Sequence, residues 1–168
     1  MFKNVCIFFC FFFAGLSLTA QPAPSSVISP KQDIILPKVF IIGEYESVYE
    51  NLVLECGDHL LTVCDGSMDD AYGLWLEMLA DMEVYADAVE FDIKGVKIWM
   101  TAYWNADGSI KHLVYYPKPS SKNMDFDKLS EFLKDFSKTY VLSKKGANCF
   151  SHYGSAAFPT FARYTRPE

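Results

Sequence analysis

The chain has 168 residues, of which 51% are hydrophobic and 21% charged, and its formal net charge is −6. This length and composition are typical of one globular domain and exclude a chain that is disordered throughout. The negative net charge argues against a nucleic-acid-binding protein, because such proteins concentrate positive charge on one surface.

Acidic and basic side chains are distributed unevenly along the chain. Residues 31–93 contain fifteen acidic and two basic side chains, whereas residues 94–168 contain six acidic and twelve basic ones. Opposite charges of this kind attract each other either within one fold or between two copies of the chain. A homodimer held through the two halves is therefore one expectation.

The first twenty residues have the order of a secretory signal peptide. One cation, Lys3, precedes an apolar run over residues 5–13, and small residues lead to a cleavage site after Ala20. The run is shorter than the roughly 20 apolar residues of a spanning helix, although an uncleaved anchor is the alternative. We expect a periplasmic or extracellular protein that starts at Gln21 and has no stable membrane span.

Residues 21–33 are rich in Pro and Ser and predict a flexible lead segment. Residues 34–168 are expected to form a single α+β domain. Its first part, residues 34–42, is apolar around Pro37 and predicts an edge strand or a docked extended stretch, since Pro is tolerated where no ladder N–H is needed.

Residues 44–91 predict a helical hairpin. The first helix has apolar side chains at helical spacing and ends near Asp65-Gly66, and the second begins at Ser67 with Asp70 three residues later. The short connection makes the two helices antiparallel neighbours. The apolar stripe of the second helix includes Trp75 and Met78. The same helix carries three carboxylates on another side, Asp70, Glu77 and Asp81. They form an ordinary solvated face, or else a site for a divalent cation or a basic partner.

After this hairpin the hydrophobic period changes from helical to alternating. Residues 94–104 predict a strand, a tight turn follows at Asp107-Gly108, and residues 109–116 predict the returning strand. Asn123 or Asp125 is expected to cap a third helix. Residues 148–153 predict a last strand, which an irregular tail follows. The predicted fold is thus an N-terminal helical hairpin packed on a small antiparallel sheet, with the order strand, hairpin, helix, strand in the second half.

Residues 95–160 resemble the C-terminal domain of TonB energy transducers. The resemblance rests on a Gly that opens the first strand (Gly95), the Asp107-Gly108 turn, and a polar Ser-Ser-Lys-Asn loop at 120–123 that leads to the helix. It implies a Gram-negative envelope protein whose partner is another envelope protein, such as an outer-membrane protein. The helix ends in Phe-Ser-Lys-Thr-Tyr at 136–140, where the family has a Trp-x-Phe-x-Pro type segment. We also expect no membrane anchor ahead of the domain, and hence a soluble relative without a transduction role.

Cleavage of the signal peptide would leave three cysteines, which allow at most one internal disulfide. Cys149 could pair with Cys56 or with Cys64, while a buried free thiol at Cys56 is the simpler interpretation. Cys56-x-x-His59 and Cys149-x-x-His152 share one spacing, and together they could furnish a Cys2His2 metal site. A core cysteine and a partly exposed histidine in each pair are the alternative, so no metal or other cofactor is predicted.

Aromatic side chains gather on the predicted strand hairpin, at Trp99, Tyr103, Tyr115 and Tyr116. They could form a stacking platform for sugar rings or a contact surface for another protein, unless the helices cover them. The sequence contains no nucleophile elbow, zinc-protease motif or Gly-rich phosphate loop, and no catalytic residue is predicted. We expect a secreted binding module that acts through protein–protein contacts. The alternative is a metal-dependent or hydrolytic secreted enzyme.

Overall fold

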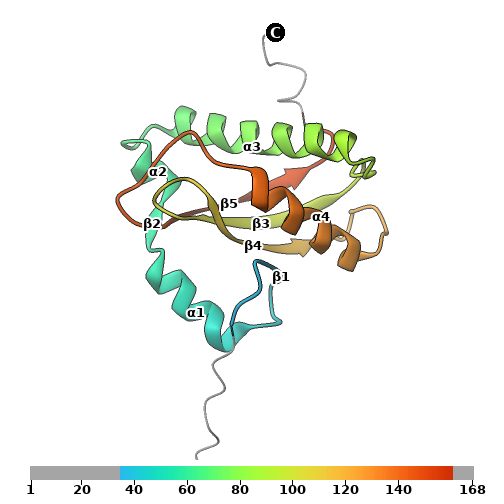
Figure 1. The fold of residues 1–168 in the computed structure, drawn as a ribbon, viewed down its shortest axis with the longest axis horizontal. Helices are drawn as coiled ribbons and strands as arrows, with labels where there is room; N and C mark the ends of the chain where they lie inside the picture. The colour runs from blue at the N-terminus through green and yellow to red at the C-terminus, as the bar shows by residue number, and fades with distance from the viewer. Residues whose placement is uncertain (1–34, 161–168) are drawn as a thin grey trace, which may run out of the picture. The chain divides into compact units, whose positions relative to one another are not determined.

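The structure is a computed structural model and describes residues 35–160. The expected signal peptide, the lead segment up to residue 33 and the end of the tail lie outside the described residues. The described part has a mixed α+β fold with a five-stranded sheet and four helices (Figure 1).

The sheet has the strand order β1-β4-β3-β5-β2. Its three long strands, β3, β4 and β5, are antiparallel, but β1 pairs in parallel with β4 and β2 in parallel with β5. The expectation of a purely antiparallel sheet is therefore wrong at both edges. The strand bounds are β1 Val39–Ile41, β2 Asp58–His59, β3 Lys97–Trp104, β4 Ile110–Pro117 and β5 Phe150–Ala157.

The helices are α1 (Glu46–Glu55), α2 (Leu60–Val63), α3 (Met68–Ala88) and α4 (Phe126–Thr139). Helices α3 and α4 pack on one face of the sheet, which we call the inner face, and enclose the main core with it. Helix α1 packs on the opposite, outer face (Figure 1). No helix within this described stretch is both long and apolar enough to span a membrane.

The predicted helical hairpin over residues 44–91 is wrong. Helix α1 ends at Glu55, and β2 and the short α2 separate it from α3, which lies on the other side of the sheet. The physical reason is that the apolar side chains before and after the break face opposite sides of the sheet. Leu52 packs against Tyr103 and Val114 on the outer face, whereas Leu60 belongs to the main core. Helical spacing continues across the break, so periodicity alone could not separate them.

Local signals correctly predicted the starts of α3 and α4 and the turn between β3 and β4. The Ser67 hydroxyl accepts a hydrogen bond from the Asp70 N–H at 3.2 Å and caps α3, and the Asp125 carboxylate caps α4. Gly108 has a φ of +89°, as the tight turn between β3 and β4 requires. Trp75 lies in the core as the stripe predicted. Strand β5 continues to Ala157, four residues beyond the predicted strand end at residue 153.

Candidate binding surface on the outer sheet face

The outer face of the sheet is covered only in part. Strands β1 and β2 lie at opposite edges, so the chain between them, which contains α1, crosses this face. Leu52 of α1 packs with Tyr103 and Val114, so the helix covers the half of the outer face in which these two residues lie. The other half carries three aromatic side chains that are exposed to 42% at Trp99, 52% at Tyr116 and 62% at Tyr153. We call these three residues the aromatic strip.

Strand register brings the strip together. Trp99 of β3 lies opposite Tyr116 of β4, and Tyr153 of β5 lies opposite Thr101, one pleat further along the same face. The rings of Trp99 and Tyr153 stack with their centroids 5.8 Å apart and their planes at 20°. Three neighbouring strands thus present their aromatic rings on one side of the sheet.

Lysines accompany the aromatic strip. The Lys118 ammonium lies 3.7 Å from the centroid of the Trp99 ring and donates a hydrogen bond to the Ser155 hydroxyl. Lys97 is exposed at the start of β3, two residues before Trp99 and therefore on the same face. The surface can thus offer flat aromatic rings and positive charge to a partner.

Two of the four aromatic residues singled out in the sequence are structural. Tyr103 is buried under α1, where its hydroxyl donates to the Tyr49 hydroxyl at 3.0 Å, and this burial raises its pKa. Tyr115 points to the inner face and donates to the Phe126 carbonyl at 3.0 Å; burial raises its pKa as well. Trp99 and Tyr116 remain on the open surface.

Tyr153 belongs to the strip but was not among the residues singled out in the sequence. The available signal was the alternation of Ser151, Tyr153 and Ser155, which places the three on one face of the last strand. Its pairing with β3 rather than β4 could not be read from that pattern, because a strand's neighbours depend on the whole sheet.

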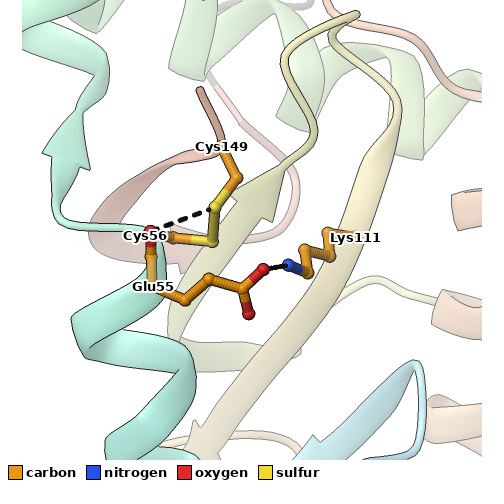
Figure 2. The surroundings of a disulfide bond; sticks show 4 residues. All are labelled: Glu55, Cys56, Lys111 and Cys149. Carbon is orange, nitrogen blue, oxygen red and sulfur yellow. Dashed lines mark hydrogen bonds and ion pairs between the residues drawn. A yellow bond between two sulfur atoms is a disulfide. The ribbon is translucent and has the colours of Figure 1, made fainter. Parts of the chain in front are cut away.

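Cys56 and Cys149 form a disulfide with their Cα atoms 4.9 Å apart (Figure 2). The interpretation of Cys56 as a free thiol is therefore wrong, and the pairing is one of the two that the sequence left open. Cys64 is the buried free thiol, and burial raises its pKa.

This disulfide contradicts the Cys2His2 metal hypothesis, because neither sulfur is a thiolate. The two histidines also differ in their exposure, although the charge of His59 lies close enough to help lower the pKa of His152. His59 is exposed, whereas His152 lies on the inner face with its ring 4.9 Å from that of Trp75, and burial lowers its pKa. Over residues 35–160 there is no group of three or more His, Cys, Asp or Glu side chains arranged to hold a metal ion.

Ion pairs join the acidic and the basic half within one chain. Lys111 pairs with Glu55 at 2.5 Å, Lys122 with Asp92 at 2.5 Å, and Lys144 with Asp65 at 3.8 Å. Attraction between the halves thus operates inside this fold. A homodimer stays a prediction, which sedimentation at low and high salt tests, since salt weakens exposed ion pairs.

Comparison with protein-family models, curated proteins and solved structures finds no match to this chain, and the TonB-like resemblance rests on the sequence features described above.

Proposed function

We propose that the protein is an exported envelope binding module that acts through protein–protein contacts made by the aromatic strip. The observation that carries this proposal is the exposure of Trp99, Tyr116 and Tyr153 side by side on one face of the sheet. Trp and Tyr dominate the binding energy of protein interfaces, because they bury a large area with few rotatable bonds.

Two further features support the proposed setting. A disulfide between Cys56 and Cys149 suits the periplasm or the extracellular space, where thiols are oxidised. The order β3, β4, α4, β5 suits the TonB-like resemblance over residues 95–160, which implies an envelope partner. Export itself is tested by mass spectrometry of the native protein, whose mature chain is expected to begin at Gln21.

The contact surface is tested by photocrosslinking in the cells that produce the protein. We would replace Tyr116 with a benzophenone amino acid and use Tyr72 of α3, which is 59% exposed, as the matched control position. The expected result is one discrete adduct from position 116 and none from position 72. Equal adducts at both positions, or none at position 116, would contradict the proposal.

The adduct identifies the partner, and its affinity for the purified mature protein then gives a quantitative test. Trp99→Ala should weaken binding by about 1–3 kcal/mol, whereas Tyr72→Ala should leave the affinity unchanged. Both variants should keep the far-ultraviolet circular dichroism of the parent, which shows that the change concerns the surface.

A further inference from the structure

We propose that Cys56–Cys149 is a thiol–disulfide exchange site whose reduction releases α1 from the outer face of the sheet. The co-reactant is a dithiol reductant, and the released helix uncovers Tyr103 and Val114 next to the aromatic strip. The proposal stands on the packing of α1 and is independent of the proposed function.

Helix α1 is weakly packed. Leu52 is its one buried residue, while Val53 and Leu54 are 45% and 80% exposed. Its other side-chain contacts with the sheet include those of Tyr49, which accepts a hydrogen bond from Tyr103 and whose ring meets those of Phe40 and Tyr103 edge-on, with centroids 6.0 and 6.3 Å apart. A ten-residue helix is marginal in water without tertiary packing, so α1 depends on its attachments.

The disulfide secures the end of α1 that leads into β2. Cys56 directly follows the helix and Cys149 directly precedes β5, so the bond fastens the two segments where they begin to pair (Figure 2). Beyond it, β2 contributes only two residues, which lie beside Phe150 and Ser151. The ion pair between Glu55 and Lys111 is the other contact at this end, and salt screens such a pair. The disulfide is therefore the covalent crosslink that ties the end of α1 to the start of β5.

A reductant can reach this disulfide in the folded protein. A cavity of about 460 Å³ lies beside it, and Glu55, Asp58, Lys111 and Asn148 contribute to the lining together with Cys149. Cys149 is half-buried, whereas Cys56 is only 2% exposed. An incoming thiolate therefore attacks the Cys149 sulfur, and the Cys56 sulfur leaves.

The exchange is balanced in two steps. The reductant's first thiolate forms a mixed disulfide with Cys149 and expels the Cys56 thiolate, which takes up a proton. The reductant's second thiolate then attacks the reductant's first sulfur, which is bonded to Cys149 in the mixed disulfide. This attack releases the Cys149 thiolate, which is protonated in turn. Two electrons pass from the dithiol to the protein disulfide, and the reductant leaves as a disulfide.

The rest of the domain does not depend on α1. The main core consists of side chains from the sheet together with α2, α3, α4 and the connecting segments, and α1 contributes none of them. Reduction should thus free one helix while the inner layers stay folded. This is local opening, in which a segment with few buried contacts separates from a more stable remainder.

The test is hydrogen exchange, measured by mass spectrometry on the mature protein with and without dithiothreitol and without denaturant. After reduction the amides of α1 and β2 should exchange within about tenfold of the rate of an unfolded chain, whereas those of α3 and β3 should stay at least about a hundredfold slower than that rate, although loss of the crosslink lowers their protection as well. Two thiols should become reactive, and buried Cys64 should stay unreactive as an internal reference. The proposal is overturned if reduction requires a denaturant concentration that unfolds α3, if α1 keeps its protection, or if α3 and β3 lose their protection as completely as α1.

Variants separate the disulfide from the added reagent. Cys56→Ser with Cys149→Ser should show the exchange pattern of the reduced protein without dithiothreitol. Cys64→Ala is the matched control, since it removes a cysteine and keeps the disulfide, and its α1 amides should stay protected. If the double variant fails to fold, the reduced parent protein decides the question alone.

Discussion

The indole of Trp75 lies directly against Gly154, so that α3 approaches β5 at a position without a side chain. A Cβ atom at Gly154 would come within 2.8 Å of the Trp75 ring, and the indole N–H donates to the neighbouring Ser155 carbonyl at 3.4 Å. The bulkiest side chain of α3 thus packs on the one residue of β5 that leaves space for it.

This contact predicts that Gly154→Ala lowers the free energy of unfolding by about 1–3 kcal/mol, because the rigid indole has to move away from the new methyl group. Urea denaturation measures the loss. Gly73→Ala on α3 is the matched control: a Cβ there meets nothing within 4 Å, and the change should stabilise the helix by about 0.5–1 kcal/mol. A smaller loss for Gly154→Ala in a Trp75→Leu background would identify the indole as the obstacle, whereas an equal loss would contradict this explanation.

The disulfide gives a second prediction about stability. Cys56 and Cys149 are 93 residues apart, and the bond restricts the unfolded chain over that length. Replacing both with Ser should therefore lower the free energy of unfolding by about 2–4 kcal/mol. The urea m-value should rise as well, because the unfolded chain without the crosslink exposes more surface. An unchanged m-value would show that the crosslink does not compact the unfolded chain.

Elements with signals inside a few residues could be predicted from the sequence. Ser67 and Asp125 cap their helices through backbone groups two or three residues away, and Gly108 occupies the turn position with positive φ. Each of these features is decided locally, so a single sequence is enough to place it.

Features that depend on which face an element meets could not be predicted. Helix α1 and the segment after it read as one amphipathic helix, yet Leu52 packs on the outer face and Leu60 on the inner face. Tyr115 and Tyr116 alternate as expected, but the sequence does not state which of them α4 covers. Two of the three residues of the aromatic strip were therefore identified, whereas Tyr153 joins them through strand pairing that has no local signal.

Two half-buried histidines predict a loss of stability in mild acid. Burial lowers the pKa of His112, although the Pro37 carbonyl at 2.9 Å from its Nδ1 acts in the opposite direction, and burial also lowers the pKa of His152. Below the ordinary pKa of 6.5 the unfolded chain takes up these protons first. The stabilisation is thus present above that pH and is lost as the pH falls through the folded-state pKa values.

Urea midpoints at pH 7.5 and pH 5 measure this effect, and a variant with His112→Gln and His152→Gln should lose less stability between them. The Asp92 and Asp107 carboxylates do not confuse the comparison, since their pKa values are lowered from 3.8 and they titrate below this window. An identical loss in the parent and the double variant would assign the acid sensitivity to other groups.

The last prediction separates the exposed from the buried aromatic residues of the hairpin. Tyr103 and Tyr115 are 3% and 1% exposed, so replacing either with Ala leaves a cavity and should cost on the order of 3 kcal/mol in urea denaturation. Tyr115→Phe removes only the hydroxyl that donates to Phe126 and should cost about 1 kcal/mol. Trp99→Ala and Tyr116→Ala remove a cross-strand pair on an open surface and should each cost at most about 1 kcal/mol. Equal losses at all four positions would mean that the outer face is closed around Trp99 and Tyr116, and these residues would then act in folding rather than in binding.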